Sequence, residues 1–139
     1  MLFRSQGNVW AFERNPVAVE LLGKNKELFG LTNLDVIAGE ALENIKTMPA
    51  PDCVFVGGSG GDLCEMLDVI YAKNSKCRIV INAITVETLA QVAAYYKEHP
   101  DYSLEIVNVF VARSKKLGSY NLMMAQNPVY VMTALKKED

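Results

Sequence analysis

A glycine-rich segment follows the short apolar run at residues 54–56. It reads Gly57-Gly58-Ser59-Gly60-Gly61, and it has the composition of a turn in which backbone N–H groups face a ligand without side-chain obstruction. Ligands of open α/β sheets bind outside the carboxyl ends of the strands, where this turn would lie. The spacing is neither G-x-G-x-x-G nor a phosphate loop ending in Lys-Ser/Thr, so neither nucleotide motif applies. A tight strand-to-helix turn without a ligand is an equal alternative.

Two other predicted strands also end in residues that could contact a ligand. Glu13 ends the run 8–13, and its carboxylate could accept hydrogen bonds from the two vicinal hydroxyls of a ribose. It could equally be a surface acid beside a helix N-terminus. Gly39-Glu40-Ala41 ends the next strand, where a turn of small residues would let an adenine ring lie flat. A plain turn before a helix is the favoured alternative there.

Further polar residues follow the later strands. Asn82 and Thr85 flank the end of the run 78–83, and Thr85 is foremost a helix cap. The segment 113–120 carries Arg113, two lysines and Tyr120, and its cations would suit a substrate with several carboxylates. A solvated loop is the favoured alternative for that segment. Asn127 precedes a proline that suits the first residue of a strand.

The overall composition excludes several classes of function. The formal charge of -2 and the lack of a basic stripe argue against nucleic-acid binding. No apolar run approaches the ~20 residues that cross a bilayer. The three cysteines form no C-x-x-C pair, so we expect a reducing, cytoplasmic setting without disulfides or zinc. Hydrolase and metalloenzyme interpretations lack a supporting set of residues.

Strands and helices alternate along most of the chain. We expect strands at 8–13, 34–38, 54–56, 78–83, 104–112 and 127–135, and helices at 16–29, 42–46, from 63 and after 85. Residues 113–126 form a long polar connection. This order predicts one α/β domain over residues 1–139, with a mostly parallel sheet and an antiparallel pair at one edge. Glu13, Gly39 and Gly57 should then lie along one edge of that sheet.

Several sequence blocks occur together in an order and spacing that resemble the decarboxylating precorrin methyltransferases, the C15-methylating enzymes of cobalamin biosynthesis. The resemblance covers nearly the whole chain. The blocks are AFERNP (11–16), GEA (39–41), PDCVFVGGSGG (51–61), INAITVET (81–88), VARS (111–114) and AQNPVY (125–130).

The resemblance implies a class I S-adenosylmethionine (SAM) fold, usually a homotetramer, that methylates a precorrin at C15 and removes carbon dioxide from its C12 acetate. The implied catalytic residues are Arg113 and Tyr120, which would orient the acetate. The implied cofactor-binding residues are Glu13, Arg14, Gly39, Glu40, Ala41, Gly57 and Gly58. The implied substrate neighbours are Ser59, Gly60, Gly61, Asn82, Thr85 and Asn127.

The sequence departs from the family pattern at its start. The family has a first strand and a glycine-rich loop before the strand that ends in Glu13, whereas only seven residues precede Asn8 here. We therefore expect an N-terminally truncated domain that holds SAM weakly. A non-catalytic remnant of the SAM fold, acting as an oligomerisation or binding module, is the alternative. A nicotinamide oxidoreductase is disfavoured because the dinucleotide glycine pattern is missing.

Overall fold

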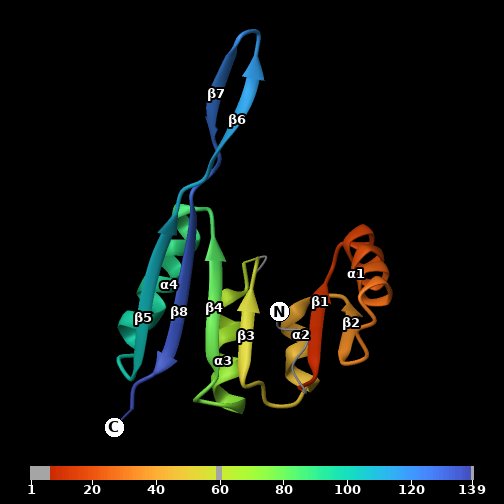
Figure 1. The fold of residues 1–139 in the computed structure, drawn as a ribbon. Coiled ribbons are helices and arrows are strands. Elements are labelled where there is room, and N and C mark those ends of the chain that lie inside the picture. Colours follow the sequence, from red (N-terminus) through yellow and green to blue (C-terminus); the bar gives the residue numbers. More distant parts are fainter. Residues whose placement is uncertain (1–6, 59–60, 139) are drawn as a thin grey trace. The chain divides into compact units, whose positions relative to one another are not determined.

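The computed structural model describes residues 7–58 and 61–138. The chain divides into two compact units, residues 1–49 and residues 50–139. Each unit has its own sheet or sheets and its own helices, and Figure 1 labels the elements. None of the helices in the described ranges has both the length and the apolar character that crossing a bilayer requires.

The first unit is a β-α-β arrangement followed by a short helix. Its elements are β1 (Val9–Glu13), α1 (Pro16–Leu28), β2 (Leu34–Ala38) and α2 (Ala41–Thr47). The two strands pair in parallel, from Val9 opposite Leu34 to Glu13 opposite Ala38. Asn15 caps α1, because its Oδ1 accepts a hydrogen bond of 2.9 Å from Val17 N. The carboxyl ends of β1 and β2 therefore coincide.

The second unit contains the main sheet. Its elements are β3 (Cys53–Val56), α3 (Leu63–Lys73), β4 (Arg78–Ala83), α4 (Val86–Glu98), β5 (Tyr102–Val109), β6 (Ala112–Leu117), β7 (Tyr120–Ala125) and β8 (Val129–Lys136). The sheet order is β3-β4-β8-β5, in which β3 and β4 are parallel and β8 is antiparallel to both neighbours. Helices α3 and α4 lie on the same face of this sheet (Figure 1). The predicted α/β class with an antiparallel pair at its C-terminal edge is confirmed.

The core of the second unit lies between that sheet face and the helices. The apolar spacing of Leu63, Leu67 and Ile70 predicts an amphipathic helix, and this face of α3 is buried, with Leu67 and Ile70 fully inaccessible to solvent. Ile79 and Ile81 of β4 are also buried, at 0% and 1% exposure. The buried residues of β4 alternate with partly exposed ones, which is the pattern of a strand covered on one face.

The β-branched and aromatic run at residues 54–56 is typical of a strand covered on both faces, and this expectation is wrong for β3. Cys53 is exposed and Phe55 is 59% exposed, whereas Val56 is buried. The physical reason is the position of β3 at the edge of its sheet, with both described long helices of this unit on one face. The face that carries Phe55 has no such cover.

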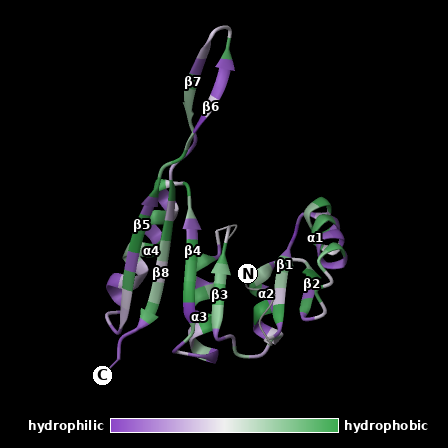
Figure 2. Cartoon of the chain, in the orientation of Figure 1, coloured by the Kyte–Doolittle hydropathy of each residue, from purple (hydrophilic) through white to green (hydrophobic). Residues whose placement is uncertain are grey.

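The prediction of a polar connection over residues 113–126 is also wrong in one respect, because this segment forms a β-hairpin. Strands β6 and β7 pair from Ala112 opposite Ala125 to Leu117 opposite Tyr120. Gly118, with a φ of 61°, allows the tight turn between them. Figure 2 shows that β6 is mainly hydrophilic, which explains why no alternation of apolar residues predicted it. The flanking strands are correspondingly displaced, since β5 ends at Val109 and β8 begins at Val129.

Four tyrosines from α3, α4 and β5 form a cluster in the second unit. The hydroxyl oxygens of Tyr71 and Tyr96 lie 2.8 Å apart, and the Tyr95 hydroxyl donates a hydrogen bond of 2.8 Å to Asp68. The rings of Tyr71 and Tyr102 pack with centroids 4.2 Å apart. Burial raises the pKa of Tyr96 to about 12, and it also raises the pKa values of Tyr71, Tyr95 and Tyr102. The cluster therefore remains uncharged well above neutral pH.

This cluster predicts a loss of stability at alkaline pH. A tyrosine whose pKa is higher in the folded state binds its proton more tightly there than in the unfolded chain. Its contribution to stability is complete below about pH 10 and is lost as the pH rises towards about 12. Urea unfolding at increasing pH, followed by tyrosine circular dichroism, should show a falling free energy of unfolding across this range. Tyr96→Phe should make the fall shallower, and an identical slope in both proteins would contradict the prediction.

Candidate functional site

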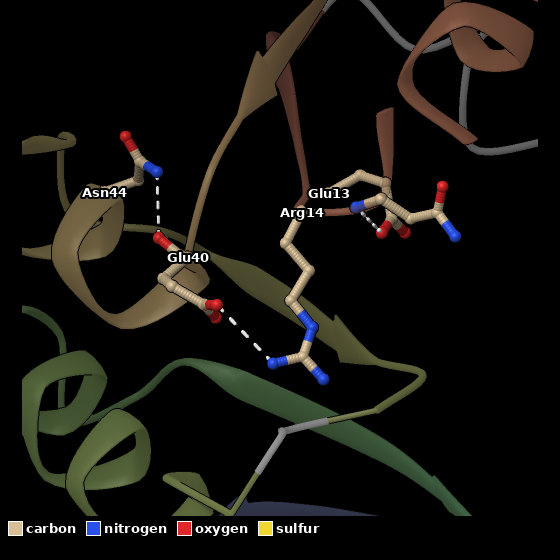
Figure 3. Close-up of polar contacts among 5 residues, drawn as sticks. Glu13, Arg14, Glu40 and Asn44 are labelled. Carbon is tan, nitrogen blue, oxygen red and sulfur yellow. Dashed lines mark hydrogen bonds and ion pairs between the residues drawn. The ribbon is translucent and has the colours of Figure 1, made fainter. Parts of the chain in front are cut away.

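Glu13 and Gly39 lie at one edge of the first unit, as predicted. The parallel register places Glu13 opposite Ala38, and Gly39 N donates a hydrogen bond of 3.0 Å to the backbone oxygen of Glu13. Figure 3 shows Glu13 and Arg14 at the end of β1, together with Glu40, which follows Gly39. The predicted common edge is thus confirmed for Glu13 and Gly39, whereas Gly57 belongs to the second unit.

The Glu13 carboxylate is held in one direction by the backbone. Its Oε1 accepts a hydrogen bond of 2.8 Å from Asn15 N, at the start of α1 (Figure 3). The side chain is half-buried. Within the described residues its Oε2 has no hydrogen-bond donor, and Oε1 keeps a second acceptor site, so the carboxylate can accept two hydrogen bonds from a ligand. This is a fixed carboxylate at the carboxyl end of a parallel strand, which is the geometry that ribose recognition requires.

Arg14 and Glu40 flank this carboxylate on the exposed side. Arg14 Nη1 lies 3.4 Å from Glu40 Oε1, and the two side chains are 63% and 58% exposed. An exposed pair of this kind contributes little to stability, so both side chains are available to a ligand. Glu40 is the N-cap residue of α2, which begins at Ala41, but its side chain makes no capping hydrogen bond.

Gly39 is required by the backbone between β2 and α2. Its φ of 128° lies in the region that side chains avoid, and a Cβ there would lie 3.2 Å from Asn44 Nδ2. Asn44 Nδ2 is itself fixed, because it donates a hydrogen bond of 2.8 Å to the Glu40 backbone oxygen. The turn therefore keeps a flat, side-chain-free position beside Glu13, which fits the expectation for an adenine edge.

The second unit has a small pocket at the carboxyl ends of β3 and β4. Its volume is about 130 Å³, which is room for a few water molecules and for only part of a nucleoside. The pocket brings together four of the predicted residues, Gly57, Gly58, Asn82 and Thr85, and adds Thr88. Thr85 Oγ1 accepts a hydrogen bond of 3.2 Å from Thr88 N, so Thr85 caps α4 as predicted. Thr88 could have been predicted from the sequence, because an N-cap residue bonds to the backbone N–H three residues further on.

The remaining predicted residues lie in three places. Ser59 and Gly60 are outside the described residues. Gly61 is exposed, with a φ of 112°, and is not among the pocket-lining residues. Asn127 is exposed just before β8, and Tyr130 of that strand pairs with Ala83 at the end of β4. Asn127 is therefore at the same end of the sheet as the pocket.

Arg113 and Tyr120 both belong to the β6–β7 hairpin and are exposed. Arg113 pairs with Met124, and Tyr120 pairs with Leu117. Residues 113 and 117 are four positions apart on one strand, a distance of about 13 Å between Cα atoms. The two predicted catalytic side chains are thus on one face of the hairpin but at opposite ends of it.

The arrangement of parallel strands with helical crossovers and an antiparallel C-terminal pair defines the fold of the SAM-dependent methyltransferases. The chain superimposes with a TM-score of 0.83 on a precorrin-6Y C5,15-methyltransferase from Geobacter metallireducens, at 37% identity over 94% of this chain and 69% of that one. Residues 1–136 match the family model for the precorrin methyltransferase domain. The chain belongs to the precorrin methyltransferase family.

Two relatives share the name "probable cobalt-precorrin-6B C(15)-methyltransferase (decarboxylating)". The one from Pyrobaculum aerophilum is 34% identical over 91% of this chain and 65% of its own length. The one from Sulfolobus acidocaldarius is 34% identical over 99% of this chain and 71% of its own length. The chain thus spans about two thirds of the length of the relatives that it matches.

Proposed function

We propose that this chain acts as a SAM-dependent methyltransferase that methylates a precorrin at C15 and removes the C12 acetate carboxyl group. The observation that carries the proposal is the Glu13 carboxylate, fixed by Asn15 N at a strand end beside Gly39. Family membership supports the reaction class, since the relatives are named as decarboxylating C15-methyltransferases.

The residues of the chain would act mainly by binding and orientation. SAM, when bound, supplies an electrophilic methyl group on a sulfonium leaving group. Glu13 would accept hydrogen bonds from the ribose, while Gly39 and Ala41 leave a flat edge for the adenine. Arg14 and Glu40 flank that edge as exposed polar groups. The sulfonium of SAM already activates the methyl group for transfer. Alignment of the reacting carbon of the substrate with that methyl group can therefore supply much of the rate acceleration.

Substrate contacts would come from the second unit. Gly57 and Gly58 offer unobstructed backbone at the pocket mouth, and Asn82 and Thr85 supply polar groups to its wall. Ser59, Gly60, Gly61 and Asn127 are proposed as further substrate neighbours on the basis of the resemblance. Arg113 would hold the acetate that loses carbon dioxide, and Tyr120 would contact another part of the macrocycle. The electrons left by decarboxylation would pass into the conjugated macrocycle, and the released group is carbon dioxide.

We also propose that the chain assembles with copies of itself, as a tetramer by the family resemblance. Supporting this, β5 and the residues after it carry exposed apolar side chains, of which Val107 is 48%, Val109 is 42% and Phe110 is 75% exposed. A row of exposed apolar side chains on one segment is typical of an interface.

Methyl transfer from isotope-labelled SAM to a precorrin acceptor tests the proposal. We expect labelled product and released carbon dioxide with this chain. Arg113→Ala should abolish the release of carbon dioxide, because Arg113 is proposed to hold the acetate that is lost. A folded chain that binds the macrocycle but transfers no label would favour the second candidate, a non-catalytic binding module. The small volume of the pocket is the observation that favours that second candidate. Unchanged methylation and unchanged carbon dioxide release with Arg113→Ala would remove the assignment of that residue.

A further inference from the structure

The side-chain amide of Asn44, a partly buried residue of α2, lies against Gly39. A Cβ on Gly39 would lie 3.2 Å from Asn44 Nδ2, so the amide is on the side of the turn to which a side chain at residue 39 would project. Gly39 N also donates a hydrogen bond to the backbone oxygen of Glu13. Gly39 therefore lies next to both Glu13 and Asn44, where β1 and β2 end.

One hydrogen bond fixes the direction of this amide. Asn44 Nδ2 donates a hydrogen bond of 2.8 Å to the backbone oxygen of Glu40 (Figure 3). A carbonyl oxygen only accepts, so the atom that faces it must be the nitrogen, and Oδ1 takes the other direction. An amide that turned over would bring two oxygens together and lose this hydrogen bond. The positions of the donor and the acceptor are therefore not interchangeable.

The amide still has hydrogen-bonding capacity for a ligand. Within the described residues Asn44 Oδ1 receives no hydrogen bond, and the second hydrogen of Nδ2 has no acceptor. An acceptor beside a donor is the pattern that pairs with adenine, because the 6-amino hydrogens of adenine lie next to a ring nitrogen that accepts. A 6-oxo purine would instead place an oxygen against Oδ1. Because the amide cannot turn over, this arrangement favours the amino base.

We propose that Asn44 is a specificity-determining residue that selects adenine over 6-oxo purines. The inference rests on the proposed function for the ligand class, and it adds the residue that recognises the edge of the base. Glu13 would bind the ribose, which all purine nucleosides share, and Gly39 offers only backbone. Glu40 is the competing acceptor, but its Oε1 lies 3.4 Å from Arg14 Nη1, and its side chain points away from Asn44 in Figure 3.

S-adenosylhomocysteine and S-inosylhomocysteine are matched probes, because they differ only in the amino or oxo group at position 6 and the hydrogen that the oxo form carries on N1. NMR titration of the isotope-labelled whole chain measures both dissociation constants even where binding is weak. The unaltered chain should bind the adenosyl compound about tenfold more tightly. Asn44→Ala should weaken that binding about tenfold and change the binding of the inosyl compound less than about twofold, so the preference disappears.

Asn33→Ala is the matched control for this loss. Asn33 Nδ2 also donates to a backbone oxygen, that of Gly7 at 2.7 Å, but Asn33 precedes β2 and lies at the amino end of the strand. Asn33→Ala should leave the preference for adenine unchanged. Asn44→Leu keeps the size of the side chain and should abolish the preference as Asn44→Ala does. Circular dichroism would show that these variants are folded.

Three results would overturn the proposal: equal affinity of the unaltered chain for the two compounds, a preference that survives Asn44→Ala, or a preference that Glu40→Ala removes instead. Neither compound carries a transferable methyl group, so the measurement is independent of the reaction. A chain that prefers the adenosyl compound through Asn44 but transfers no label from SAM contradicts the proposed function alone. A chain that transfers the label but binds both compounds equally contradicts the role of Asn44 alone.

Discussion

Replacing Glu13 with alanine is expected to weaken SAM binding about a hundredfold. The Glu13 carboxylate is fixed by the hydrogen bond from Asn15 N, and it can accept hydrogen bonds from both hydroxyls of a ribose. A hydrogen bond to a charged group contributes about 1.5 kcal/mol, so the loss of two corresponds to about two orders of magnitude in the dissociation constant. Calorimetry, or saturation-transfer NMR if the affinity is weak, would measure the change.

Two further variants separate ribose recognition from a general effect of charge. Glu13→Gln keeps one acceptor oxygen in the same place and should lose less affinity than Glu13→Ala. Glu43→Ala removes an exposed acid of α2 in the same unit, where Glu43 Oε1 lies 2.8 Å from Lys46 Nζ, and should leave SAM binding unchanged. If Glu43→Ala weakened binding as much as Glu13→Ala, the carboxylate of Glu13 would have no specific role.

Much of the fold could be predicted from the sequence because its signals are local. The apolar spacing of Leu63, Met66, Leu67 and Ile70 defines the buried face of α3 within one helix. The capping residues Asn15 and Thr85 act within three residues of their own positions, and both are of residue types that favour the N-cap. Strands β2 and β4 occupy the predicted ranges, since both are short apolar runs bounded by turn residues.

The features that sequence reasoning missed depend on contacts between distant segments. Phe55 is exposed because β3 lies at the edge of the sheet. The order of the strands cannot be predicted from residues 54–56 alone. The β6–β7 hairpin is exposed on both faces, so no burial imposes the alternation by which strands are predicted. The polar residues of β6 are therefore indistinguishable from those of a loop.

The candidate site was predictable to the extent that it depends on parallel strands. A parallel pair aligns its carboxyl ends, which is why Glu13 and Gly39 lie together and why Gly57 and Asn82 line one pocket. The positions of Arg113 and Tyr120 depend instead on the register of a hairpin that the sequence did not reveal. Only the register shows that they share a face and stand at opposite ends of it.

Replacing Leu67 with alanine is expected to lower the free energy of unfolding of the second unit by about 3 kcal/mol. Leu67 is fully buried in α3, and truncation removes its transfer free energy and leaves a cavity that packed neighbours fill only in part. Urea unfolding should be followed by the circular dichroism of the tyrosine cluster, because the single tryptophan, Trp10, lies in β1 of the first unit and reports on that unit. Leu117→Ala is the matched control, since the same side chain is 63% exposed in the hairpin and its loss should change the free energy by less than about 0.5 kcal/mol. Equal midpoints for the two variants would show that α3 does not hold the second unit together, and the pocket at the ends of β3 and β4 would then lack the rigid support that binding requires.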